Sequence, residues 1–170
     1  MADITAIFFI LLVIGVAYPA LLTAWWLLFP APVERARLRL ERTPWQSFWL
    51  GGIALAVVII PILALLAMPF GFAKLLGWIL IALVLAFSGF GAAGLAARIG
   101  ERLGRLSSLS TAAAFVRAAI VLELASFFPV IGWFIVFPLA TVTCLGASAF
   151  ALLHWLPKPA PGAEAAPAKA

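Results

Sequence analysis

Long apolar runs without a single charge constrain this chain more than any other feature. Residues 4–29, 47–68 and 75–97 contain no Asp, Glu, Lys or Arg. A helix needs about 20 mostly apolar residues to cross the hydrocarbon core of a bilayer. Only 10% of the 170 residues are charged and 66% are apolar, whereas about a quarter of a soluble domain is charged. The chain is therefore predicted to be an all-α integral membrane protein, and an ordinary soluble domain is excluded.

Two more helices are predicted after the third run. Apolar residues resume at Ala112 and continue to Trp155, which is too long for one crossing, and residues 129–132 (Pro-Val-Ile-Gly) divide this stretch. The prediction is a bundle of five transmembrane helices in one domain, residues 1–156, followed by a disordered, Ala/Pro-rich cytoplasmic tail at 157–170. The five helices are expected at about 4–29, 47–68, 75–97, 111–128 and 133–154.

The fourth of these helices contains two charges, Arg117 and Glu123. Its eight large apolar residues favour insertion by roughly 2–5 kcal/mol together, whereas each charge opposes insertion by about 2.5–3.5 kcal/mol if it is central. The segment should not insert stably by itself and needs the fifth helix as a partner. Four spans with one interfacial or re-entrant helix are the alternative architecture.

Basic residues predict the orientation, because Lys and Arg are held on the cytoplasmic side of a membrane. Under five spans, nine of the eleven basic residues lie on one side, and Lys74 is alone in an external loop. The N-terminus is then outside and the C-terminus cytoplasmic, in the cell inner membrane. Seven arginines in the first and third loops are expected to contact anionic headgroups of the inner leaflet, and no nucleic-acid partner is expected. They are Arg35, Arg37, Arg39, Arg42, Arg98, Arg102 and Arg105.

Glu123 and Arg117 are the candidate functional residues, because ionisable groups inside a membrane are costly and often functional. Glu123 shares a helix face with the small residues Ala119 and Ser126, so we expect it to face another helix. It could carry a proton or bind an ion, or it could be a structural carboxyl that fixes packing. Arg117 lies about 120° around the helix from Glu123, so the two do not pair along one face. It is expected to reach the headgroups, bond a neighbouring chain or take part in transport.

Small residues at a spacing of four, Gly89, Ala93 and Ala97, predict close helix packing, either within the chain or against another copy or complex. The sequence contains no pattern of a catalytic dyad or a metal site, so no enzyme activity, cofactor or metal is predicted. His154 is the one histidine. Whether it ligates a haem or a pigment stays open, since a second axial ligand is not evident.

Three segments resemble a family of small multi-pass bacterial membrane proteins of unknown function, whose members are sometimes linked to bactofilin-type polymer-forming proteins. They are Thr43-Pro-Trp-Gln-Ser-Phe-Trp-Leu-Gly51, Ile99-Gly-Glu-Arg-Leu-Gly-Arg105, and Arg117 with Phe128-Pro-Val-Ile-Gly-Trp133. The resemblance implies a bacterial inner-membrane protein and supplies no activity. The chain has no polymer-forming β-repeat, so a cytoskeletal role does not carry over.

Two functions compete on this basis. The favoured one is a non-catalytic structural or accessory protein, alone or as a subunit of a larger membrane complex. The alternative is a small oligomeric transporter or channel that uses Glu123 and Arg117. The expected partners are membrane lipids and either a second copy of the chain or a larger complex.

Overall fold

The computed structural model describes residues 2–155, and the tail predicted at 157–170 lies outside them. The described chain is helical apart from short turns and contains no strand, which confirms the predicted all-α class. The order is α1 (Ala2–Leu28), α2 (Pro30–Arg42), α3 (Pro44–Ala67), α4 (Gly71–Leu106), α5 (Thr111–Phe127), the π-helical segment η1 (Gly132–Val136) and α6 (Phe137–Leu152).

Local sequence explains where several helices begin. Pro30 and Pro44 stand at the first positions of α2 and α3, where the missing N–H would have no partner in the helix. At the start of α5, the Ser110 hydroxyl accepts a hydrogen bond from the Ala113 N–H at 3.3 Å. Proline and serine therefore mark the first turns of these three helices.

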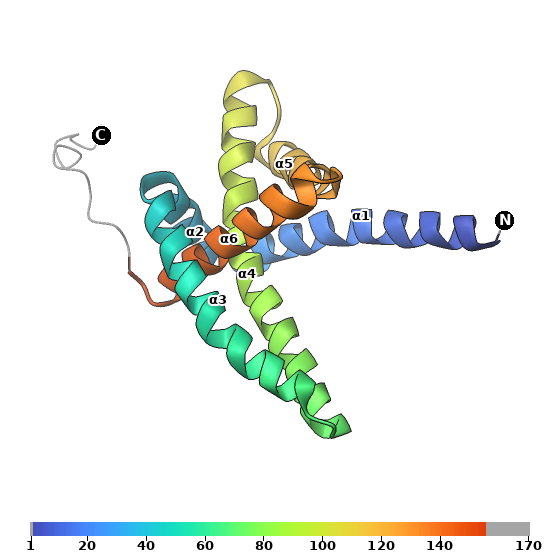
Figure 1. Cartoon of the computed structure of the whole chain (residues 1–170). Helices are drawn as coiled ribbons and strands as arrows, with labels where there is room; N and C mark the ends of the chain where they lie inside the picture. Colours follow the sequence, from blue (N-terminus) through green and yellow to red (C-terminus); the bar gives the residue numbers. More distant parts are fainter. Residues whose placement is uncertain (1, 156–170) are drawn as a thin grey trace.

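The long helix α4 lies at the centre of the molecule and packs against α1, α2, α3, α5 and α6. In Figure 1, α1 and the α3–α4 hairpin extend from this centre in different directions. The largest core cluster lies on the small-residue stretch of α4, where side chains from α1, α2, α5 and α6 meet. Its buried members are Leu22, Val33, Ala92, Ala93, Ala96, Phe115, Ala119, Leu122 and Cys144.

Helix α6 crosses α3 and α4 with backbone against backbone. A Cβ atom added to Gly146 would overlap the Ser47 carbonyl oxygen, and one added to Gly51 would overlap the Val142 carbonyl oxygen. The same holds for Gly91, where the obstacle is the Cys144 carbonyl. Glycines therefore let three helices approach as closely as their backbones allow.

Among the described residues, three helices are long and apolar enough to cross a membrane, namely Pro44–Ala67, Gly71–Leu106 and Gly132–Leu152. The count rises to four if Gly15–Leu28 and Pro30–Arg42, which meet at a bend of 107°, form one broken span. The predicted count of five is not confirmed. At 17 residues, α5 is shorter than a typical span.

Two helices differ from the predicted boundaries. The third helix was expected to end near residue 97, but α4 continues without a break to Leu106 and includes the charged segment that follows. The first loop is helix α2, with Val33, Ala36 and Leu40 buried against the bundle. Amphipathic periodicity explains both results, because each segment has an apolar face that packs on protein.

Candidate functional site

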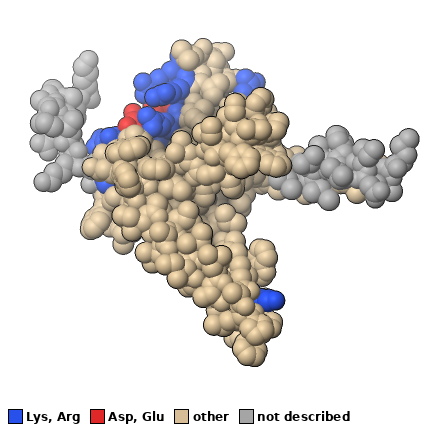
Figure 2. All heavy atoms as spheres, viewed as in Figure 1, with Lys and Arg blue, Asp and Glu red and all other residues tan. Residues whose placement is uncertain are grey.

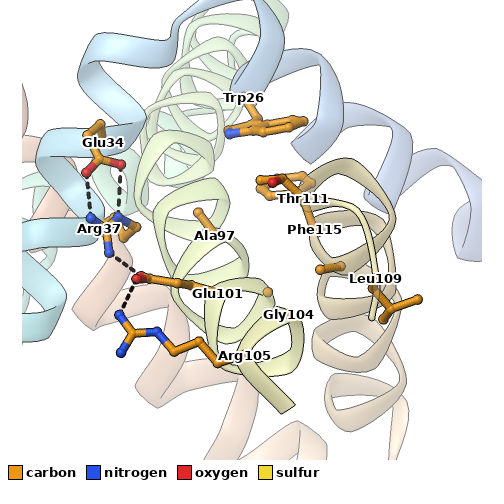
Figure 3. Close-up of a pocket in the computed structure, with 12 residues that line it drawn as sticks. Trp26, Glu34, Arg37, Ala97, Glu101, Gly104, Arg105, Leu109, Thr111 and Phe115 are labelled. Atoms are coloured by element: carbon orange, nitrogen blue, oxygen red, sulfur yellow. Dashed lines mark hydrogen bonds and ion pairs between the residues drawn. The ribbon is translucent and has the colours of Figure 1, made fainter. Parts of the chain in front are cut away.

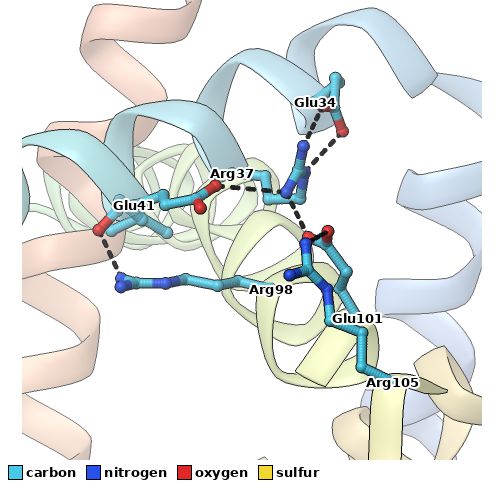
Figure 4. A network of polar contacts seen from close by, with 7 residues as sticks. Glu34, Arg37, Glu41, Arg98, Glu101 and Arg105 are labelled. Atoms are coloured by element: carbon cyan, nitrogen blue, oxygen red, sulfur yellow. Dashed lines mark hydrogen bonds and ion pairs between the residues drawn. The ribbon is translucent and has the colours of Figure 1, made fainter. Parts of the chain in front are cut away.

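A charged cluster joins α2 to the C-terminal part of α4. Figure 2 shows basic and acidic side chains gathered on one side of the molecule, whereas the α3–α4 hairpin is uncharged for most of its length. Arg37 is at the centre of this cluster (Figure 4). Its guanidinium donates hydrogen bonds to Glu34 at 2.6 Å and Glu101 at 2.5 Å, and lies 3.4 Å from Glu41. Arg105 donates to the second oxygen of Glu101 at 2.6 Å.

The contacts in this cluster favour the charged forms of Arg37 and Glu101. The pKa of Arg37 is raised, chiefly by its hydrogen bonds to Glu34. The pKa of Glu101 is lowered, first by the hydrogen bond from Arg105 and then by the charge of Arg37. Both shifts favour the ion pair between Arg37 on α2 and Glu101 on α4, so the cluster is a cross-link between two helices.

Two other arginines are turned into the protein. Arg39 is buried, with its guanidinium carbon 3.8 Å from the centre of the Phe150 ring and a 3.2 Å hydrogen bond to Gln46. Burial lowers its pKa. Arg98 donates to the Leu40 carbonyl at 2.5 Å. These contacts attach α2 to both α4 and α6.

The seven arginines predicted to contact headgroups thus occupy different environments. Arg37, Arg39 and Arg98 have the protein partners described above. Arg42, Arg102 and Arg105 are exposed, and Arg35 is half-buried. Headgroup contact stays a prediction. Its best candidates are Arg42 and Arg102, which are exposed and, unlike Arg105, form no ion pair with another described residue.

A cavity of about 410 Å³ opens beside the charged cluster (Figure 3), between α1, α2, α4 and α5. Glu34, Arg37, Glu101 and Arg105 form its polar wall. The opposite wall is apolar and includes Trp26 stacked on Phe115 with ring centroids 4.6 Å apart. The charged groups of the polar wall already bond one another, so none of them is a free catalytic base.

Glu123 lines a second cavity, of about 450 Å³, together with Tyr18, Ser126, Phe127, Trp133 and Phe137. Its side chain is 5% exposed, and within the described chain its Oε1 atom has no hydrogen-bond partner. The Ser126 hydroxyl donates to the Leu122 carbonyl at 2.9 Å. Ala119, one turn before Glu123, is fully buried.

Arg117 does not belong to this cavity. Its side chain is exposed on α5, whereas Glu123 is buried. The two candidate charges are therefore on different sides of one helix, and the structure does not bring them together.

The small residues of α4 lie in helix interfaces. Gly89 faces the Trp25 indole, Ala93 is fully buried, and Ala97 lines the first cavity. Sequence reasoning missed Ser148, whose hydroxyl accepts from the Gly91 N–H at 2.8 Å and donates to the Cys144 carbonyl at 2.9 Å. It also missed Gly51 and Gly146. Their one available signal was glycine inside apolar runs, where it normally weakens a helix.

No group of three or more His, Cys, Asp or Glu side chains able to hold a metal occurs among the residues that the structure describes. His154 is exposed past the end of α6, with Nδ1 3.0 Å from the Leu152 carbonyl.

Comparison of the chain with protein-family models, curated proteins and solved structures gives no match. Function is therefore inferred from the residues of this chain alone.

Proposed function

We propose that this chain is a non-catalytic, multi-pass protein of a bacterial inner membrane with a structural or accessory role, alone or as a subunit of a larger complex. The observation that carries this proposal is the attachment of α2. Arg37 and Arg98 join α2 to α4, and Arg39 joins it to α6. Where α4 and α6 cross, glycine lets their backbones come into contact. Packing of this kind holds the charged surface of α2 and α4 in a fixed position on the apolar helices, as a structural or accessory role requires.

Five membrane spans, with the N-terminus outside and the C-terminus cytoplasmic, are part of this proposal. α1 has 27 residues, which makes it about 40 Å long at 1.5 Å per residue. α5 has 17 residues and is about 25 Å long, close to the 30 Å of a bilayer core. The test is a reporter fused after Ala170. Cytoplasmic activity supports five spans, and periplasmic activity contradicts them.

Purification of the full-length protein in a mild detergent tests the accessory role. We expect one larger complex to co-purify at constant stoichiometry. Reversing two exposed charges, with Arg42→Glu and Arg102→Glu, should release it. Ser108→Glu is the control, because it adds an exposed negative charge beyond the end of α4. A homo-oligomer with a polar lumen, free of other proteins, contradicts the proposal.

A second function, a small oligomeric transporter or channel, is favoured by one observation: the buried Oε1 atom of Glu123 has no hydrogen-bond partner among the described residues. Because Arg117 is exposed on another side of α5, only a neighbouring copy could join the two charges in one path. Flux through proteoliposomes decides between the two functions. Glu123→Gln should abolish flux if the chain transports a solute, and should leave it at the background level of empty vesicles if the role is structural.

A further inference from the structure

The second cavity holds an unusual combination of one carboxyl group and four aromatic rings. Tyr18 comes from α1, Glu123, Ser126 and Phe127 from α5, and Trp133 and Phe137 from η1 and α6. Its volume of about 450 Å³ is in the range of cavities that hold one small organic molecule. Aromatic faces attract cations through their negative quadrupole, and a carboxylate attracts them by charge.

The carboxyl group is the part of this cavity that internal contacts do not explain. A buried polar atom without a hydrogen bond destabilises the fold, and Oε1 of Glu123 has no partner within the described chain. Arg117 cannot supply one, since it is exposed elsewhere on α5. The hydroxyl of Ser126 already donates to Leu122. A hydrogen-bond donor or positive charge that reaches this Oε1 atom therefore has to come from outside these residues.

The exposed aromatic rings of the cavity wall indicate how a ligand would enter. Phe127, Trp133 and Phe137 are all exposed in part, by 37%, 63% and 53% of their surfaces. By the rise of α5, Glu123 lies about 7 Å below Phe128 at the predicted outer boundary. With α5 crossing the membrane as proposed above, a molecule that reaches Glu123 passes these aromatic rings from the apolar phase, so it must partition into the membrane.

We propose that this cavity binds a lipophilic organic cation, an apolar or aromatic molecule with one permanently charged or protonated nitrogen or phosphorus centre. The carboxylate of Glu123 neutralises the charge, and Tyr18, Phe127, Trp133 and Phe137 surround the apolar body. Binding requires neither the accessory role nor transport, so its failure would leave both of those functions standing, and their failure would leave it standing.

The test uses full-length protein in nanodiscs and tetraphenylphosphonium as the probe. Quenching of Trp fluorescence and equilibrium dialysis should both show saturable binding at one site per chain. Triphenylphosphine oxide, which has a similar apolar shape without the charge, should bind at least tenfold more weakly. Equal binding of the two probes would overturn the proposal, because it would mean that the cavity selects apolar shape alone. Absence of saturable binding by the wild-type protein would overturn it as well.

Substitutions test whether the phosphonium probe binds in this cavity. Glu123→Gln should weaken binding of the phosphonium at least tenfold and leave binding of the neutral probe unchanged, whereas Glu123→Asp should retain most of the affinity. Trp133→Leu should weaken binding of both probes. Glu41→Gln, a change of the same chemistry at an exposed residue outside the cavity whose ion pair with Arg37 is long at 3.4 Å, is the matched control and should bind as the wild type does. If Glu123→Gln does not fold, the charge selectivity of the wild type and the loss in Trp133→Leu decide the question. Unchanged phosphonium binding by folded Glu123→Gln would overturn the proposal.

A lipid amine is the other source of a positive charge in the membrane. Binding is therefore compared in nanodiscs of phosphatidylglycerol alone and in nanodiscs that also contain phosphatidylethanolamine. Equal affinity supports a free organic cation as the occupant. Competition by phosphatidylethanolamine would assign the cavity to a lipid headgroup and would overturn the proposed occupant.

Discussion

At the scale of single residues, glycine decides how closely the helices approach. Gly146 faces the backbone of α3 at Ser47, and no side chain can move aside to admit a methyl group there. Gly146→Ala should therefore force α3 and α6 apart and cost about 1–3 kcal/mol or more, as overpacking of a core does. Gly52→Ala is the matched control, since its Cβ would lie 4.0 Å from Val142 Cγ1, an ordinary contact. Thermal unfolding in detergent measures both, and equal midpoints for Gly146→Ala and wild type would contradict this account.

Glu101 makes a residue-scale prediction about pH. Its pKa is lowered in the folded protein by Arg105 and Arg37, so its contribution to stability is complete above the ordinary carboxyl pKa of about 4.3. That contribution is lost as the pH falls below this value and through the lowered pKa. Glu101→Gln should therefore unfold at a lower temperature than wild type at pH 7. The difference should shrink on acidification toward pH 3, and a difference that grows would contradict the assignment.

The sequence predicts the surroundings of some side chains and not of others. Glu123 was expected to face another helix because Ala119 and Ser126 share its face, and it is buried in the structure. The partners of Arg37 and Arg39 were not foreseen. An arginine in a loop between two spans looks like a headgroup anchor, and only the packing of α2 on α4 and α6 places Glu101 and Phe150 beside these side chains.

At the scale of elements, α5 is the least able of the five proposed spans to enter a membrane independently. Its two charges outweigh its apolar residues, and in the structure it packs against α1 and α4. In an insertion assay with residues 111–128 placed in a host protein, we expect the segment to insert poorly. Arg117→Leu should improve its apparent insertion free energy by about 3 kcal/mol, whereas Arg117→Lys should have little effect. Efficient insertion of the unmodified segment would contradict this expectation.

The positions of the apolar helices follow from hydropathy, but their ends do not. The charged residues after position 97 suggested that the helix ends there, whereas α4 continues to Leu106. A charged segment with an apolar face can extend a helix beyond the membrane as easily as it can begin a loop. Likewise α2 turns 107° from the helix before it, because Pro30 ends one helix and starts another.

At the scale of the whole molecule, five apolar segments suggested an ordinary bundle, yet α1 and the α3–α4 hairpin diverge from a shared centre (Figure 1). The divergence could not be read from helical periodicity, since it depends on where backbones cross. The α3–α6 crossing lies at Gly51 and Gly146, and the α4–α6 crossing lies at Gly91. Helix α1 meets α4 where Trp25 lies against Gly89.

The orientation of this molecule can be tested by cysteine labelling, because the single native cysteine, Cys144, is buried and should not react. Cysteines introduced at exposed positions report on each side of the membrane: Phe72→Cys at the α3–α4 turn, Ile131→Cys between α5 and α6, and Ser108→Cys after α4. With a maleimide that does not cross membranes, intact cells should label the first two almost completely. Ser108→Cys should react only after permeabilisation, since it adjoins the charged cluster on the proposed cytoplasmic side. Labelling at Phe72 without labelling at Ile131 would mean that α5 does not cross, and would reduce the proposed five spans to four. Labelling at Ser108 alone would reverse the orientation, and with it the assignment of the charged surface to the cytoplasm.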